Sequence, residues 1–321
     1  MTRRLLSSGE VVVDLVLSVP ALPPRGGDVL ATGVATAPGG AFNVMAAAAR
    51  QGVPVTYAGL LGTGPMADLA VAALASEGID VALAPRPSPD TGTVVTLVEP
   101  GGERTFVTTL GAEAQLTEAD LAAVVVRPDD IVHVSGYGLT YPCNGPNLAD
   151  WVAILPGSVT LLLDPGPLVA ETPPSLLSRV LDRTDWVSCN LVEARALLDE
   201  PDGNDPFAMA ERLSATFRSG VVLRLGERGA VVATYDVPAV HVPAVDVRAV
   251  DLNGAGDAHV GSFVASMATQ GRAFDPVTAV VRANMAAAIA VSRPGPSAAP
   301  TGQELENFGT SGPLPADEGR R

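Results

Sequence analysis

The stretch of residues 251–262, DLNGAGDAHVGS, places a Gly-Ala-Gly turn and two acids before residues 263–270, a run without proline or glycine. Such a turn has little side-chain bulk, so its backbone N–H groups can approach an anion, and a helix start adds unpaired donors and a positive dipole end. The stretch therefore suits a phosphate group. An acid at this place would repel the phosphate, which makes Asp257 a candidate general base. From this motif alone, an ordinary helix N-cap explains Asp257 as well.

A second glycine turn near the start of the chain repeats this arrangement. Gly39 and Gly40 follow Pro38, and Asn43 stands three residues after Gly40, before an alanine-rich segment that Gly52 ends. The pattern predicts a tight turn that runs into a helix. The Asn43 side chain can hydrogen-bond a hydroxyl group there, although a capping role accounts for it equally.

A third turn, residues 62–67, matches the GxGxxA pattern of dinucleotide-binding sites. Such a site needs an acid at the far end of the following strand, whereas Asp80 lies at the near end of the run 80–84. We therefore disfavour a nicotinamide cofactor and a dehydrogenase. Pro65 fits the first turn of a helix without any ligand.

The composition narrows the classes of function. Of the 321 residues, 47% are hydrophobic and 4% aromatic, which favours helix-covered parallel strands over an aromatic-rich sandwich. The net charge of −15 argues against nucleic acid as a partner. All 20 cationic residues are arginines, and the absence of lysine excludes a P-loop and Schiff-base chemistry. No apolar run is long enough to span a bilayer, so we expect no membrane partner and a cytoplasmic location.

The elements that must position these residues alternate between predicted strands and helices. Residues 5–17 are apolar apart from Glu10 and Asp14, which predicts one buried parallel strand whose end presents an acid. Residues 91–98 and 103–109 predict a hairpin. We expect an α/β fold with a doubly wound, mostly parallel central sheet, helices on both faces and a small β lid.

The predicted organisation is one domain over residues 1–300. Its lid comes from about residues 15–36 and 91–110. Residues 301–321 are rich in glycine, proline and acids, which predicts a flexible C-terminal tail.

Together, Gly39-Gly40-Ala41-Phe42-Asn43 and Asp251-Leu-Asn-Gly-Ala-Gly-Asp257 resemble the paired signatures of the ribokinase-like, phosphofructokinase B-type carbohydrate kinases. The resemblance extends over about residues 5–300 and includes Asn190-Leu-Val-Glu193 and Leu225-Gly-Glu-Arg-Gly229. It implies a doubly wound α/β domain with a β lid over a sugar. It also implies transfer of the γ-phosphoryl group of ATP to a substrate hydroxyl.

The resemblance assigns a role to each matching residue. Asp257 would take the hydroxyl proton, with Gly254, Ala255 and Gly256 donating backbone hydrogen bonds to the transferring phosphate. The residues implied to bind substrate are Asp14, Gly39, Gly40, Asn43 and Arg104. Those implied to line the ATP site are Asn190, Glu193, Arg224, Gly226, Glu227, Gly229 and Asn284. Glu193 would act near Mg²⁺ through water and Asp251 near an activating monovalent cation such as K⁺. As a motif alone, Asn190 and Glu193 match a capping box equally well.

We therefore expect an ATP- and Mg²⁺-dependent kinase of a sugar or of a sugar-containing small molecule such as a nucleoside, assembled as a homodimer through the lid. The early half of the chain offers few arginines for the phosphate of a phosphorylated sugar, which disfavours a phosphofructokinase. Phe42, Phe106 and Tyr137 either form an apolar wall for a nucleobase or belong to the core. A protein of this fold that binds a sugar or nucleotide without turnover is the alternative from another class.

Overall fold

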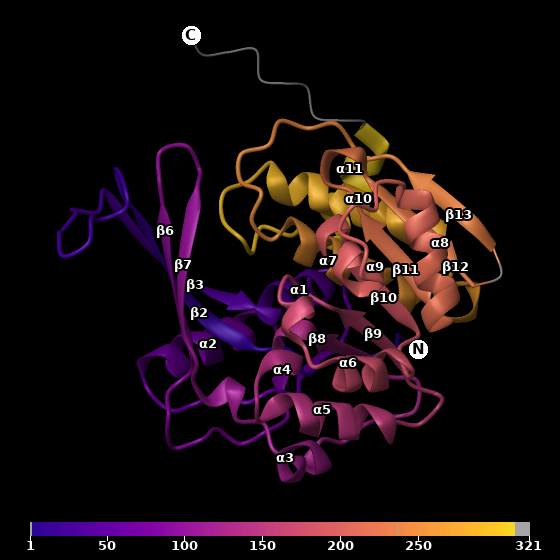
Figure 1. Cartoon of the computed structure of the whole chain (residues 1–321), viewed down its shortest axis with the longest axis horizontal. Helices are drawn as coiled ribbons and strands as arrows, with labels where there is room; N and C mark the ends of the chain where they lie inside the picture. Colours follow the sequence, from indigo (N-terminus) through magenta and orange to yellow (C-terminus); the bar gives the residue numbers. More distant parts are fainter. Residues whose placement is uncertain (1, 236, 312–321) are drawn as a thin grey trace.

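The computed structural model describes residues 2–235 and 237–311, and two sheets organise this part of the chain (Figure 1). The larger, central sheet has the strand order β13-β12-β11-β10-β9-β8-β1-β4-β5. Its neighbouring strands pair in parallel except at one edge, where β12 pairs antiparallel with both β11 and β13. Their bounds are β1 (Leu5–Ser7), β4 (Val55–Tyr57), β5 (Asp80–Val81), β8 (Ile131–Ser135), β9 (Thr160–Asp164), β10 (Trp186–Asn190), β11 (Gly220–Arg224), β12 (Ala230–Thr234) and β13 (Val237–Val242).

Helices cover both faces of the central sheet, because successive strand residues point to opposite faces. Leu5 and Ile131 belong to one apolar core, and their neighbours Leu6 and Val132 belong to the other. The first core is covered by α1 (Ala41–Ala49), α2 (Pro65–Ser76), α9 (Ala255–Gln270) and α10 (Pro276–Val291). The second is covered by α3 (Glu118–Ala123), α5 (Asn144–Ala153), α6 (Pro174–Leu181), α7 (Leu191–Leu198) and α8 (Pro206–Phe217). The predicted doubly wound fold is confirmed.

Shorter elements complete the chain. The remaining helices are α4 (Gly136–Thr140) and α11 (Gly302–Ser311). The single 3₁₀ turns are η1 (Ala112–Ala114), η2 (Val169–Glu171), η3 (Gly226–Arg228) and η4 (Gly271–Ala273). None of the helices in the described ranges is both long and apolar enough to cross a bilayer.

The smaller sheet is the predicted lid. Its strand order is β3-β2-β6-β7, with bounds β2 (Val11–Ser18), β3 (Gly33–Gly40), β6 (Thr93–Val98) and β7 (Arg104–Thr109). The predicted hairpin is the antiparallel pair β6 and β7, whereas β2 and β6 run parallel. In Figure 1 this sheet stands apart from the central sheet, beside α1 and α2.

The prediction of one strand over residues 5–17 is wrong. The chain forms β1 in the central sheet, leaves it at Ser8 and continues as β2 in the lid. Gly9 permits this passage, because a Cβ atom there would lie 2.5 Å from the Cβ of Ala41. Asp14 consequently lies within the lid strand β2 instead of at the end of a central strand.

The predicted tail also needs correction over its first part. Residues 302–311 form helix α11, and Leu305 and Phe308 are buried against Ala286 and Ile289 of α10. The apolar side chains spaced three apart give this helix a face that packs on the domain. Residues 312–321 of the predicted tail lie outside the described residues.

Helix α9 approaches α1 closely because the contact is made by small residues. A Cβ atom on Gly261 would lie 2.5 Å from the Cβ of Ala47 and 2.6 Å from the backbone oxygen of Val44. Ala47 and Ala258 belong to a shared buried cluster beside this contact. The distance between these two helices is therefore limited by glycine and alanine side chains.

We predict that Gly261→Val lowers the free energy of unfolding by about 1–3 kcal/mol, because two added methyl groups and a Cβ must separate the helices. Urea unfolding followed by circular dichroism measures the change. Gly157→Ala is the control, since a Cβ there meets no atom within 4 Å. Equal unfolding midpoints for the two variants would contradict the proposed steric limit.

Candidate active site

A cavity of about 560 Å³ lies between the lid sheet and the starts of helices α1, α4 and α9. The lid contributes alternate residues of β2, because side chains spaced by two share a face of a strand. The predicted site residues that line the cavity are Asp14, Gly40, Asn43, Glu193, Arg224, Gly254, Gly256 and Asp257. Two motifs more than 200 positions apart in the sequence are thus brought to one place.

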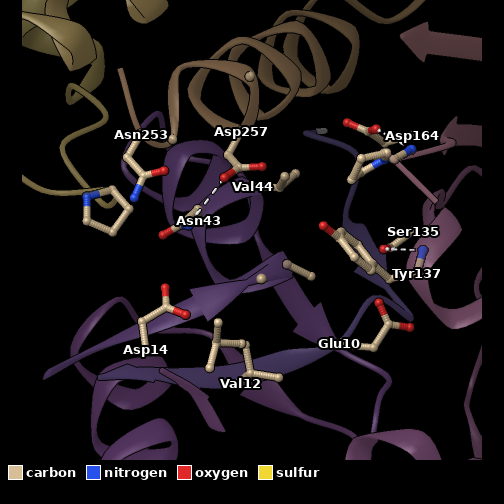
Figure 2. A pocket seen from close by; sticks show the side chains of 18 of the residues that line it. Glu10, Val12, Asp14, Asn43, Val44, Ser135, Tyr137, Asp164, Asn253 and Asp257 are labelled. Carbon is tan, nitrogen blue, oxygen red and sulfur yellow. Dashed lines mark hydrogen bonds between the residues drawn. The ribbon is translucent and has the colours of Figure 1, made fainter. Parts of the chain in front are cut away.

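Asp257 lies in the first turn of α9 and faces Asn43 of α1 (Figure 2). The Asn43 Nδ2 group donates to Asp257 Oδ2 at 3.2 Å, and Ser297 Oγ donates to Asn43 Oδ1 at 2.6 Å. Burial raises the pKa of Asp257 to about 6, and nearby Asp164 adds to the rise. A carboxylate with this pKa is largely ionised at neutral pH and basic enough to accept a proton.

The capping explanation for Asp257 is wrong, because the N-cap residue of α9 is Gly254. Gly254 has φ of 72°, in the left-handed region, and a Cβ atom there would lie 1.9 Å from the Pro296 backbone oxygen. Only glycine fits that position without strain. At Gly256, by contrast, the nearest atoms to an added Cβ belong to Arg224 at 3.9 Å. The Gly254–Gly256 turn therefore leaves open space beside the start of α9.

The lid side of the cavity carries Asp14, which is half-buried on β2. Burial raises the pKa of Asp14 to about 6. Gly39 makes room for this carboxylate, because a Cβ atom on Gly39 would lie 2.4 Å from Asp14 Oδ2. Gly40 has φ of 62°, and a Cβ there would meet the Glu10 backbone oxygen at 2.2 Å. Both glycines thus shape the site through the absence of side chains.

Arg224 occupies the cavity beside the Gly254–Gly256 turn, held by two carboxylates. Its Nη1 donates to Asp164 Oδ2 at 3.1 Å and to Ser188 Oγ at 2.8 Å, and its Nη2 donates to Glu193 Oε2 at 3.4 Å. Burial alone would lower the pKa of Arg224, but Asp164 and Glu193 together raise it. Arg224 is the one arginine among the described residues that line the cavity.

Asn190 and Glu193 form the capping box that their spacing allows. Asn190 Oδ1 accepts from the N–H groups of Val192 and Glu193 at 2.8 and 2.9 Å, and Glu193 Oε2 accepts from the Asn190 N–H at 2.8 Å. Burial raises the pKa of Glu193, against the lowering effect of Arg224. Glu193 also lines the cavity, so capping and an active-site position coexist in this residue.

Arg104 and Asp251 meet each other instead of lining the cavity. The Arg104 Nη2 group on the lid lies 2.6 Å from Asp251 Oδ1 on the body. Asp251 also accepts from the N–H groups of Asn253 and Gly295, and these contacts outweigh its burial and lower its pKa. A carboxylate with these N–H donors does not fit the predicted ligand of a monovalent cation.

The other residues predicted for the ATP site lie away from the cavity. Asn284 is buried, donates to the backbone oxygens of Val242 and Pro243 at 3.0 Å each, and pairs with His259 at 3.2 Å. Its amide is thereby committed to holding α10 against β13, which gives the predicted adenine contact no support. Gly226 and Glu227 are exposed in the turn between β11 and β12, and Gly229 is buried at the end of that turn. Ala255, the first residue of α9, is not itself part of the cavity wall, although its neighbours Gly254 and Gly256 are.

The GxGxxA turn before α2 binds a side chain of the protein itself. Asp90 Oδ2 accepts from the Met66 N–H at 3.0 Å, and Asp90 Oδ1 accepts from the Ala67 N–H at 2.9 Å. The donors that a dinucleotide phosphate would need are therefore taken. This geometry agrees with the rejection of a nicotinamide site.

Several cavity residues had no role in the sequence-based interpretation. They are Glu10, His133, Ser135, Tyr141 and Asp164. Asp164 ends strand β9, so the rule that ligands bind at the carboxyl ends of parallel strands could have identified it. Glu10 shares a face of the extended chain with Val12 and Asp14, because the three residues are spaced two apart. That this face belongs to the lid becomes clear only once the strand break at Ser8 is known.

The lid, the glycine turn at a helix start and the half-buried carboxylate of Asp257 together define a ribokinase-like small-molecule kinase. A model of the pfkB family carbohydrate kinases matches residues 2–302. The chain is also 32% identical over 305 residues to a protein of Escherichia coli (strain K12) named uncharacterized sugar kinase YegV, covering 92% of this chain and 91% of YegV. The chain therefore belongs to the pfkB family of carbohydrate kinases.

Solved structures show the same fold. The ribokinase of Giardia lamblia has a TM-score of 0.81 at 23% identity, covering 97% of this chain and 99% of that one. A putative ribokinase II of Escherichia coli, in complex with ATP and Mg²⁺, has a TM-score of 0.79 at 24% identity, covering 96% and 99%. At these identities the likeness supports the architecture and leaves the individual site residues to the geometry above.

We predict opposite effects on stability for two alanine substitutions in the Gly254–Gly256 turn. Gly254→Ala should lower the free energy of unfolding by about 1–3 kcal/mol, because the left-handed conformation and the Pro296 contact both oppose a side chain. Gly256→Ala should leave stability unchanged or raise it by up to about 1 kcal/mol, since this residue is helical and has space. Thermal and urea unfolding of both variants compare the two, and a loss at Gly256 equal to that at Gly254 would contradict the geometry.

Proposed function

We propose that this carbohydrate kinase transfers the γ-phosphoryl group of ATP to a hydroxyl of an unphosphorylated sugar or sugar-containing small molecule, with Asp257 as general base. The observation that carries the proposal is the position of Asp257. Its half-buried carboxylate lies in the first turn of α9, beside the Gly254–Gly256 turn and facing the cavity. In the proposed reaction it takes the proton of the hydroxyl as that oxygen bonds to phosphorus and the bond from phosphorus to the ADP oxygen breaks.

The groups that would stabilise the transferring phosphate are the backbone donors of Gly254, Ala255 and Gly256 and the guanidinium of Arg224. Phosphoryl transfer depends mainly on positioning and on charge stabilisation, and preorganised donors supply both. The chain has no lysine, so Arg224 is the cationic side chain available at this cavity. Asp164 and Glu193, which also line the cavity, form ion pairs with Arg224 and hold it in place.

The carboxylates of Asp164 and Glu193 suit a Mg²⁺ ion that keeps part of its water shell. Among the described residues there is no group of three or more His, Cys, Asp or Glu side chains arranged as a metal cage. Mg²⁺ is commonly held by one or two carboxylates and substrate phosphates, and when bound it neutralises charge on the phosphates. We therefore propose water-mediated contact from Glu193 and Asp164. We do not extend the proposal to K⁺, because Asp251 does not line the cavity and is paired with Arg104.

Asp14 and Asn43 are proposed to position the substrate hydroxyls, with Gly39 and Gly40 providing the space beside them. Asp14 lies on the lid strand β2, and Asn43 lies on α1. A sugar between them would therefore contact both the lid and the rest of the domain (Figure 2). Asp14 accepts hydrogen bonds when ionised, and an asparagine amide both donates and accepts. A sugar with adjacent hydroxyls satisfies both.

A nucleoside remains the second candidate acceptor because aromatic rings line the cavity. Phe106 and Tyr137 lie on its wall, whereas Phe42 is only 2% exposed and belongs to the core. Aromatic faces stack on a nucleobase and on the apolar face of a sugar ring alike. We also propose a cytoplasmic location, since the phosphoryl donor ATP is supplied there. Binding without turnover is disfavoured by the intact pairing of Asp257 with Asn43.

The function is tested by ADP release with Mg²⁺ and ATP on ribose, fructose, glucose, their phosphate esters and adenosine. Asp257→Asn should lower kcat about a hundredfold to ten-thousandfold, the range for loss of a general base, with a much smaller change in the KM for sugar. Asp202→Asn, at an exposed acid, is the matched control. Turnover by Asp257→Asn at the unaltered rate would remove Asp257 as the base.

We also predict an acid limb in the pH profile of kcat/KM. Asp257 must be ionised to accept a proton, so activity should fall as pH decreases through about 6, the pKa that burial gives this carboxyl. Asp14 has a raised pKa of about 6 as well, so the profile is compared with that of Asp14→Asn. A limb retained in Asp14→Asn assigns it to Asp257, and a profile flat down to pH 5 contradicts the assignment.

The proposed assembly is a homodimer through the lid. The outer lid strands β3 and β7 have no further neighbour in the described sheet and expose Val34 at 70% and Val107 at 59%. Unpaired edges with apolar side chains are suited to pairing with another chain. In a symmetric dimer the same lid edge of both copies forms the contact, so apolar side chains of one copy would meet apolar side chains of the other.

We expect light scattering to give twice the 32.6 kDa chain mass for the wild type and a mass near that of one chain for Val34→Glu/Val107→Glu. Buried charge at an apolar contact opposes association. Ile154→Glu is the control, because Ile154 is 79% exposed at the end of α5, outside the lid. A monomeric wild type would overturn this assembly and leave the kinase proposal intact.

A further inference from the structure

Glu10 is a buried acid of the cavity that the proposed reaction does not use. It directly precedes β2, and Glu10, Val12 and Asp14 follow one another at the spacing of a single strand face. Figure 2 shows Glu10 on the lid side, below Tyr137 and near Ser135, while Asp257 lies across the cavity. A substrate held at Asp257 and Asp14 therefore has further groups that extend toward Glu10.

The surroundings of Glu10 make it an uncharged hydrogen-bonding group. The residue is 5% exposed, and its Oε1 atom has no hydrogen-bond partner among the described residues. Burial raises the pKa of Glu10 to about 8, with Glu113 adding to the rise and Ser135 hydrogen bonding opposing it. At neutral pH the carboxyl is mostly protonated, so it both donates and accepts.

The chain makes room for this carboxyl in a specific way. A Cβ atom on Gly138 would lie 2.1 Å from Glu10 Oε1, so a glycine in the middle of α4 leaves the space that the acid occupies. A buried acid without a neighbouring cation lowers the stability of the fold. A space kept for such a side chain suggests that the side chain has a function. Arg224, the arginine that lines the cavity, is already engaged by Asp164 and Glu193.

His133 provides a second unsatisfied atom at the same end of the cavity. Its Nδ1 lies 2.9 Å from Ser7 Oγ, while its buried Nε2 has no partner in the described part of the chain. Burial lowers the pKa of His133 to about 4, so the ring is neutral. Both His133 and Ser135 approach Gly9, the residue before Glu10, since a Cβ there would lie 3.6 Å from His133 Cε1 and 3.2 Å from Ser135 Cβ.

We propose that Glu10, with His133 beside it, forms a specificity subsite that hydrogen-bonds a hydroxyl of the sugar other than the one phosphorylated. An uncharged polyhydroxy group satisfies the unpaired atoms, whereas a phosphate or carboxylate would meet Glu10 and Asp14 with no free cation. The inference rests on the proposed function and deepens it. It selects free sugars over sugar phosphates and sugar acids as substrates.

The experiment compares Glu10→Met, which removes hydrogen bonding at similar length, with Glu10→Gln, which keeps a neutral donor and acceptor. The probes are D-ribose, D-fructose and D-glucose, each beside its phosphate ester, and the kinetics use the sugar that the wild type turns over fastest. For that sugar we expect Glu10→Met to raise KM about tenfold, the size of one hydrogen bond, and to change kcat less than threefold. Glu10→Gln should restore KM to within about threefold, and the KM for ATP should not change.

Stability separates a substrate contact from a purely structural role. Loss of a buried acid should leave the unfolding temperature of Glu10→Met equal to or above that of the wild type, because the desolvation cost disappears. A lower unfolding temperature with an unchanged sugar KM would make Glu10 structural and overturn the proposal. Glu103→Gln, on the exposed lid hairpin, is the control for loss of an acid.

The remaining outcomes are equally decisive. A phosphate ester preferred over its parent sugar overturns the subsite, as does a Glu10→Gln variant as impaired as Glu10→Met, which would mean that a charged Glu10 is required. Turnover that depends on Asp257 but ignores Glu10 overturns the subsite and leaves the kinase proposal standing. Absence of turnover with every probe refutes the proposed function itself, and the subsite with it.

Discussion

The close contact between α1 and α9 is the constraint on which the site depends. Gly261 allows α9 to approach Ala47, and the first turns of the two helices then bring Asn43 within 3.2 Å of Asp257. Packed interiors transmit the displacement caused by one bulky residue over several ångströms, so the helix contact also fixes the distance between the proposed base, Asp257, and the amide of Asn43. Burial raises the pKa of Asp257 to about 6, a value that suits the proposed role as a base.

The distribution of charge divides the cavity into two parts. Arg224 lies on the phosphate side and is surrounded by Asp164 and Glu193, which keep it charged and immobile. The lid side carries Asp14 and Glu10, and burial without a cation raises both pKa values. In the proposed reaction, backbone donors and one guanidinium would therefore take the place that lysines have in many phosphate sites, and the lid side would suit neutral groups.

The sequence predicted much of the fold and several of the residues that line the cavity, because both depend on local patterns. Alternating strands and helices predicted the doubly wound sheet and the lid hairpin, and the two glycine turns predicted helix starts that the fold brings to one cavity. The strand break at Ser8 was not predictable, because an apolar run looks the same whether its strands join one sheet or two. The roles of Asn284 and Asp251 also depend on partners distant in the sequence, Val242 and Arg104, that no local pattern identifies.

The lid sheet is linked to the rest of the domain by the candidate site residues and by one ion pair. Asp14 lies on the lid strand β2, whereas Asp257 lies on α9, so the proposed sugar site between them depends on how the lid is placed against the rest of the domain. Arg104 and Asp251 link the sheets through side chains that are 26% and 21% exposed, and ion pairs of this kind contribute about 0–1 kcal/mol. Such a contact is too weak to hold a lid shut against substrate entry. Asp251 also accepts a hydrogen bond from the N–H group of Asn253, just before the Gly254–Gly256 turn. One carboxylate therefore links the position of the lid to the shape of the proposed phosphate site.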